Sequence, residues 1–161
     1  MAGWSCLDLP VHVDERRPLL TLSDRIGANG VNGTKPAKSA TILLVEDDGP
    51  LLVFFSTVLR REGYTIITAA NGQEALDIAE GRPDEPIHIL LSDVAMPYMG
   101  GIQLAVNLRQ TRPDLLVLLT SGLPQKEVSD RCGPAFKADF LAKPFSVSDL
   151  AGKIRLMADT L

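Results

Sequence analysis

The feature of this sequence that most constrains its fold is an apolar run that ends in a carboxylate. Pro86 precedes the run, which covers residues 87–91, and Asp93 follows it. A short apolar run between turn residues predicts a buried strand, and the loop after Asp93 supplies such residues: Pro97, Gly100 and Gly101. Asp93 is then expected at the carboxyl end of a central strand, where open α/β sheets bind ligands. Taken alone, an Asp in this place also suits a turn or a helix cap.

Strand-like and helix-like segments alternate along the chain from residue 41 onward. The predicted strands cover residues 41–45, 64–69, 87–91, 115–119 and 138–142. Apolar residues at helical spacing predict helices over about residues 51–62, 72–79, 101–112, 124–133 and 147–157. Two of these helices begin with the spacing of a capping box, Asn71 with Glu74 and Ser146 with Asp149.

This alternation predicts an α/β fold with a doubly wound five-stranded parallel sheet. Alternating strands and helices form parallel sheets with helices on both faces, and short fully apolar strands agree with burial on both sides. The connections in such sheets are almost always right-handed. The five-stranded form has strand order 2-1-3-4-5, with a crevice between the ends of the first and third strands. Asp47 and Asp93 are expected to meet in that crevice.

Composition excludes several classes of protein. The chain has 161 residues, 45% of them hydrophobic, and a net charge of −4, so no basic surface indicates a nucleic-acid partner. No apolar run reaches the roughly 20 residues that span a bilayer, and no secretory signal opens the chain. Cys6 and Cys132 lie too far apart to indicate a zinc site or a disulfide framework. We therefore expect a soluble, cytoplasmic protein that contacts no membrane.

The chain is predicted to contain one folded domain and an extension. Residues 1–39 show no sustained periodicity, and residues 27–39 have the Gly, Asn, Pro and Lys content of a flexible linker. The expected division is a flexible N-terminal extension over residues 1–39 and a domain over residues 40–161. A few apolar residues between Leu19 and Ile26 leave open a short helix that docks on a partner or on a second copy.

Polar residues with complementary chemistry follow four of the predicted strands. Glu46 and Asp47 follow the first strand, Asp93 the third, Ser121 the fourth and Lys143 the fifth. Carboxylates that lie together repel one another and call for a cation, and hard oxygen ligands in a partly open site suit Mg²⁺. An ammonium, a hydroxyl and Mg²⁺ are what phosphoryl transfer needs. Each residue also has a plain alternative, such as a Lys143–Asp93 ion pair or a helix cap at Ser121.

Residues 40–160 resemble the receiver domain of two-component response regulators, which has a flavodoxin-like fold. The resemblance rests on four motifs in the order of that family: I-L-L-V-E-D-D, D-V-A-M-P-Y-M-G-G, L-L-T-S-G and F-L-A-K-P-F. It implies a phosphoprotein of a phosphorelay that takes a phosphoryl group from phosphohistidine and then switches a partner-binding surface. The implied partners are a histidine kinase or histidine phosphotransfer protein and a downstream protein target, and homodimer formation stays open.

The resemblance also implies roles for individual residues. Asp93 corresponds to the phospho-accepting aspartate, and Asp47 to a direct Mg²⁺ ligand. Glu46 corresponds to an acidic residue that acts partly through water, and the carbonyl oxygen of Ala95 to a backbone ligand of the metal. Three further positions correspond to the switch hydroxyl, the phosphate-binding lysine and the switching aromatic residue: Ser121, Lys143 and Phe140. A cis peptide bond between Lys143 and Pro144 is implied as well, and Phe140 as a static core residue remains the alternative.

Other functions stay open beside the phosphoryl-accepting switch. The same fold could serve as a docking module independent of phosphorylation, or as the receiver segment of a larger hybrid histidine kinase. The acidic loop after the first strand disfavours a flavin-binding protein, because a phosphate cradle needs Gly, Ser and Thr with free N–H groups. Neither His12 nor His88 has the helical setting of a phosphodonor. We therefore expect no enzyme beyond the chemistry of its own phosphorylation and dephosphorylation.

Overall fold

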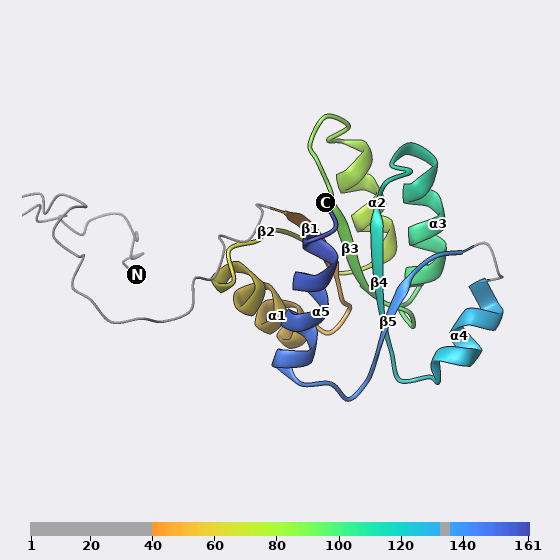
Figure 1. Cartoon of the computed structure of the whole chain (residues 1–161). Coiled ribbons are helices and arrows are strands. Elements are labelled where there is room, and N and C mark those ends of the chain that lie inside the picture. The colour runs from red at the N-terminus through yellow and green to blue at the C-terminus, as the bar shows by residue number, and fades with distance from the viewer. Residues whose placement is uncertain (1–39, 133–135) are drawn as a thin grey trace, which may run out of the picture. The chain divides into compact units, whose positions relative to one another are not determined.

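The computed structural model describes residues 40–132 and 136–161. These residues form a five-stranded parallel sheet that lies between helices. The strand order is β2-β1-β3-β4-β5, which confirms the predicted order and the doubly wound fold class (Figure 1). The strands are β1 (Thr41–Val45), β2 (Thr65–Ala69), β3 (Ile89–Asp93), β4 (Leu116–Ser121) and β5 (Asp139–Ala142). The helices are α1 (Gly49–Arg61), α2 (Gly72–Glu80), α3 (Gly101–Thr111), α4 (Gln125–Cys132) and α5 (Val147–Ala158).

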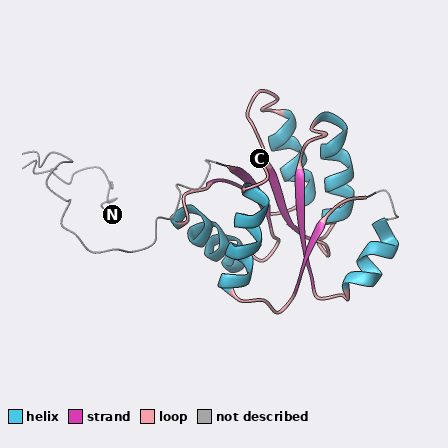
Figure 2. Ribbon diagram, in the orientation of Figure 1, coloured by secondary structure: helices cyan, strands magenta, loops and turns pink. Residues whose placement is uncertain are grey.

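Two apolar clusters, one on each face of the sheet, hold the layers together. On one face, α1 and α5 pack on the sheet through residues such as Leu59 and Ile154. On the other face, α2, α3 and α4 contribute Ala75, Leu104 and Val128 to the second cluster (Figure 2). Successive residues of a strand point to opposite faces, so the continuous apolar strands supply both clusters. Burial on both faces explains why the central strands β1, β3 and β4 have no polar alternation.

The third strand begins and ends two residues later than predicted. The sequence predicted a strand over residues 87–91, whereas β3 covers Ile89–Asp93. Ile87 is buried, so the apolar pattern predicted its burial correctly. The pairing of β3 with β1 begins only at Ile89. As a result Asp93 is the last residue of β3 and pairs in register with Thr120 of β4. The fourth strand is also displaced, to Leu116–Ser121.

Side-chain caps fix the starts of three helices near the carboxyl ends of the strands. Asp48 accepts a hydrogen bond from the Leu51 amide and so caps α1. Ser146 and Asp149 form the complete capping box predicted for α5. At α2 the prediction is half right: Asn71 accepts from the Glu74 amide, but the Glu74 carboxylate accepts from the Ala70 amide instead of the cap residue.

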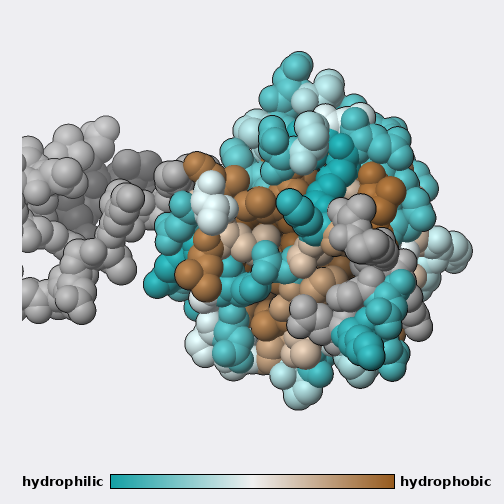
Figure 3. Space-filling view, turned by 45° about the vertical axis from the view of Figure 1, so that its right-hand side comes forward, coloured by the Kyte–Doolittle hydropathy of each residue, from teal (hydrophilic) through white to brown (hydrophobic). Residues whose placement is uncertain are grey.

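Several predictions concern residues outside the described part of the chain. They include the flexible extension over residues 1–39 with Cys6 and His12, and the division into an extension and a domain stays a prediction. Within residues 40–132 and 136–161, no helix is long and apolar enough to cross a membrane. On the face of the domain in Figure 3, apolar surface lies between hydrophilic margins. The large apolar side chains that the described part leaves exposed are Leu51, Val53, Phe54, Tyr98, Val106, Val147, Leu156 and Leu161.

Candidate functional site

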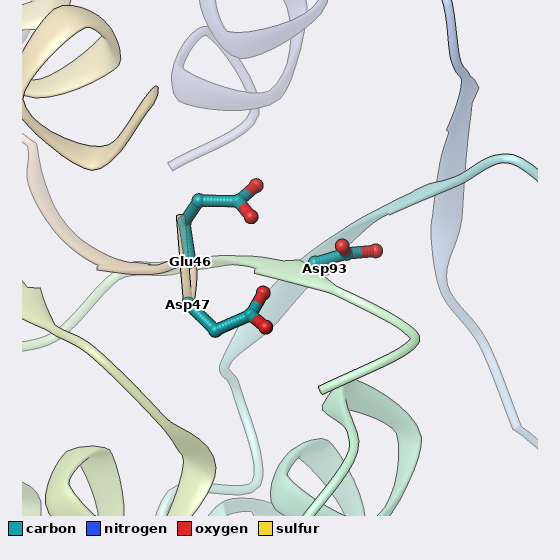
Figure 4. Close-up of side chains that lie close together, drawn as sticks. All are labelled: Glu46, Asp47 and Asp93. Atoms are coloured by element: carbon teal, nitrogen blue, oxygen red, sulfur yellow. The ribbon is translucent and has the colours of Figure 1, made fainter. Parts of the chain in front are cut away.

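Three carboxylates gather where β1 and β3 end, as the sequence predicted. Glu46 and Asp47 follow the last residue of β1, and Asp93 is the last residue of the neighbouring strand β3 (Figure 4). One carboxylate oxygen of each residue lies within 4.8 Å of the others. Glu46 is buried, Asp93 is half-buried and Asp47 is exposed, so the group opens to solvent on the Asp47 side. The strand order brings these residues together, because β1 lies directly beside β3.

The ammonium group of Lys143 bonds two of these carboxylates. Its Nζ lies 2.9 Å from Oδ2 of Asp93 and 3.3 Å from Oε2 of Glu46. The Lys143 amide also donates to the carbonyl oxygen of Ser121 at 2.8 Å, which fixes the segment after β5 to the end of β4. The Lys143–Pro144 peptide bond is cis, in agreement with the resemblance. The ion pair that the sequence left open therefore exists.

Charge and burial act against each other in this group. Burial raises the pKa of Glu46; Lys143 opposes that effect and Asp93 adds to it, so the pKa lies above its ordinary value. Burial lowers the pKa of Lys143, but its hydrogen bond to Asp93 and the charges of Asp93 and Glu46 outweigh burial and raise it. Lys143 thus stays charged, and its single charge does not balance three carboxylates.

The donor set fits a magnesium ion. Mg²⁺ prefers oxygen ligands at about 2.1 Å in octahedral geometry, which places neighbouring ligand oxygens roughly 3 Å apart and opposite ones roughly 4 Å apart. Glu46, Asp47 and Asp93 each offer one carboxylate oxygen, all within 4.8 Å of one another, and one of the three residues is exposed, which leaves room for water ligands. The excess negative charge favours a cation in this place.

The remaining predicted site residues lie at the end of β4, in the loop after β3 and in β5. Ser121 is buried at the end of β4, and its Oγ accepts a hydrogen bond from the Leu123 amide at 2.9 Å. The Ala95 amide donates to Oδ1 of Asp93 at 3.3 Å, so the loop after β3 folds back over the carboxylate. Phe140 is half-buried and packs against the cluster beneath α2, α3 and α4.

Two features of the structure add detail to the predicted site. The bond between Lys143 and Glu46 joins residues 97 positions apart, and no local spacing reports such a contact. Asp48, the third acidic residue after β1, belongs to the α1 cap and not to the carboxylate group. The signal for this division was present in the sequence, because Pro50 two residues later is typical of the first turn of a helix.

Comparison with known proteins identifies the family. Residues 42–155 match the family model described as the response regulator receiver domain. The chain belongs to this family. This receiver domain is 39% identical to the sensor kinase CckA of Brucella abortus over 75% of the chain, which is 13% of that kinase. It is 33% identical to the response regulator receiver protein CpdR of the same organism, over 72% of the chain and 94% of that protein.

Solved structures of receiver domains agree with the fold. The chemotaxis protein CheY4 of Vibrio cholerae superposes with a TM-score of 0.66 at 28% identity, over 74% of this chain and 99% of that one. The receiver domain of the hybrid histidine kinase CckA superposes with a TM-score of 0.62 at 31% identity, over 74% and 99%. The chain thus corresponds to nearly all of some relatives and to a small part of others, such as the whole sensor kinase.

Proposed function

We propose that this receiver domain accepts a phosphoryl group on Asp93 from a phosphohistidine of a partner protein. The observation that carries the proposal is the contact of Lys143 with Asp93, 2.9 Å from Nζ to Oδ2, beside the carboxylates of Glu46 and Asp47. Phosphoryl transfer demands positioning of the nucleophile and neutralisation of charge more than covalent help from the protein. Membership of the receiver family supports the same reaction.

Asp93, Lys143 and Ser121 have different roles in the transfer. An oxygen of Asp93 forms a bond to phosphorus while the bond from phosphorus to the histidine nitrogen breaks. The imidazole keeps that electron pair and takes up a proton. Lys143 is already at Asp93 and neutralises charge on a phosphoryl oxygen, and the Ser121 hydroxyl donates a hydrogen bond to another. The Ser121 oxygen also accepts from the Leu123 amide, so a shift of the hydroxyl toward the phosphoryl group pulls on this turn.

Magnesium belongs to this proposal as a cofactor. Glu46, Asp47 and Asp93 would hold it together with the carbonyl oxygen of Ala95, with Glu46 acting partly through water. Bound Mg²⁺ supplies positive charge beside the transferred phosphoryl group. The support is the donor set itself, since three carboxylates exceed the charge of Lys143.

The proposed output is a protein-binding switch and not turnover of a substrate. Phosphorylation draws Ser121 toward the phosphoryl group, and Phe140 changes its packing in response. The surface of α4, β5 and α5 then binds a downstream protein. The proposed setting is the cytoplasm, with residues 1–39 as a flexible extension and a histidine kinase or histidine phosphotransfer protein as donor.

A second candidate places the same domain inside a hybrid histidine kinase. Its support is the 39% identity to the sensor kinase CckA, of which the matched region is 13%. The chemistry at Asp93 is the same in both cases. The two differ in the donor: a hybrid kinase carries the phosphohistidine in the same chain, whereas a separate regulator receives the group from another protein.

Phosphorylation by small donors tests the proposed chemistry without a partner. The chain is incubated with acetyl phosphate or phosphoramidate and Mg²⁺, and the modified residue is mapped by mass spectrometry. We expect one phosphoryl group on Asp93 and its loss in Asp93→Ala or with excess chelator. Asp48→Asn is the matched control, because it removes the neighbouring charge outside the carboxylate group and retains a residue that caps α1. Undiminished labelling of Asp93→Ala would refute the proposal.

A further inference from the structure

Tyr98 combines complete exposure with an unfavourable backbone conformation. The residue is 100% exposed, and its φ is +65°. Among the described residues it is the one non-glycine residue with positive φ. Positive φ costs free energy in residues with a β-carbon, and such strain persists where the surrounding structure enforces it, often at functional sites. Because the Tyr98 ring is fully exposed, burial in the core does not offset this cost in free energy.

The loop that carries Tyr98 is anchored on both sides. The Met99 amide donates to the Pro97 carbonyl at 2.7 Å, which closes a three-residue turn around Tyr98. Met99 lies on α2 at Gly72, where an added β-carbon would be 2.5 Å from the Met99 carbonyl oxygen. After the turn, the Gly101 amide donates to the Val94 carbonyl at 3.2 Å, so the loop closes back on the end of β3. These contacts present the ring of Tyr98 on a fixed support.

The position of the turn limits what the ring can contact. Tyr98 follows Asp93 by five residues, in the loop that leaves the same end of β3. A small phosphodonor needs access only to the half-buried carboxylate of Asp93. A protein donor must bring a histidine to Asp93 and therefore covers the loops around it. Tyrosine is enriched among residues that dominate binding energy, because its large ring loses little conformational entropy on binding.

We propose that Tyr98 is a docking residue for the protein phosphodonor, held in advance by the strained turn. The partner is expected to present an apolar pocket beside its phosphohistidine, into which the ring fits. This inference rests on the proposed phosphoryl transfer to Asp93 and adds the residue that distinguishes a protein donor from a small one. Tyr98 acts in binding and takes no part in the chemical step.

The test compares two donors on the same variants. One donor is acetyl phosphate. The other is the fastest member of a panel of purified sensor kinases, CckA of Brucella abortus included, each labelled on histidine with ATP. For Tyr98→Ala and Tyr98→Gly we expect the KM for the kinase to rise about tenfold or more, the usual scale for loss of a dominant interface residue. Labelling by acetyl phosphate stays at the wild-type rate, and Tyr98→Phe retains most of the kinase reaction.

Further variants separate the ring from the strain. Tyr98→Gly relieves the positive φ and should melt at a higher temperature than Tyr98→Ala, while both lose docking equally. Leu156→Ala is the matched control: this side chain is 68% exposed near the end of α5, at the opposite edge of the sheet, and should change neither reaction.

Several outcomes would overturn the proposal. Unchanged kinase kinetics in both Tyr98→Ala and Tyr98→Gly would show that Tyr98 does not dock the kinase. Equal losses with both donors would place Tyr98 in the reaction itself. Recovery in Tyr98→Gly alone would assign the effect to the backbone and not to the ring. Labelling of wild type by acetyl phosphate but by no kinase of the panel also counts against a docking residue. Failure of acetyl phosphate to label Asp93 would instead refute the proposed function.

Discussion

The two edges of the sheet use polar side chains in opposite ways. At the amino edge, where the strands begin, the side chains of Arg112 and His88 bond backbone groups. At the carboxyl edge, where the strands end, the ammonium group of Lys143 bonds the carboxylates of Glu46 and Asp93. The amino-edge bonds use side-chain groups to satisfy carbonyl and amide groups of the fold. The carboxyl-edge residues keep excess charge, which is available to a ligand. The first arrangement stabilises the domain, and the second prepares a reaction.

Arg112 is the strongest example at the amino edge. Its guanidinium donates to the carbonyl oxygens of Glu85 at 2.9 Å, Ala79 at 3.1 Å and Arg82 at 2.8 Å. It therefore ties the end of α3 to the end of α2 and to the loop before β3. His88 acts similarly, because its Nδ1 accepts from the Thr41 amide at 3.0 Å where β1 begins. This contact gives His88 a structural role at the start of β1.

Among the substitutions that test this difference between the two edges, Arg112→Ala is expected to have the largest effect on stability. Loss of charged hydrogen bonds to three carbonyl groups should lower the free energy of unfolding by about 2–3 kcal/mol, measured by urea denaturation. Labelling of Asp93 by acetyl phosphate should keep its wild-type rate. Arg82→Ala is the control, because the Arg82–Glu85 ion pair is exposed and contributes little. A slower labelling rate in Arg112→Ala would show that the edges are coupled.

Lys143→Ala should have the opposite effect. The lysine side chain is 28% exposed, and its removal should leave the domain folded. Without the ammonium group, phosphorylation loses a contact that favours the switched state, and the population shift should fall about tenfold, or 1.4 kcal/mol. Amide NMR shifts of β4 and β5 report that shift at equal phosphorylation, with Lys143→Arg as the control that keeps the charge. An unchanged shift would mean that Lys143 is as structural as Arg112.

The sequence predicted the carboxyl edge better than the amino edge. Apolar runs located the strands, and the fold class then placed Asp93 and Lys143 at strand ends on one edge of the sheet. Arg112 carried no such signal, because its partners are backbone carbonyl groups, which every residue has. The positive φ of Tyr98 was equally hidden, since neither Gly nor Asn marks that position of the turn. Contacts to the backbone depend on the folded path of the chain and not on residue type.

Asp149 combines features of the two edges, because it is a carboxylate near the carboxyl edge that bonds the backbone. Its Oδ2 accepts from the Ser146 hydroxyl at 2.7 Å and from the Ser146 amide at 2.9 Å. These two bonds, the hydroxyl first, hold the pKa of Asp149 below its ordinary value of 3.8. A lowered pKa in the folded state means that the unfolded state binds more protons between the two values. The cap therefore stabilises fully above pH 3.8 and loses its contribution as the pH falls through the folded-state pKa. We expect Asp149→Ala to melt slightly below wild type at neutral pH and the difference to shrink in acid, whereas a difference independent of pH would exclude the carboxylate as its source.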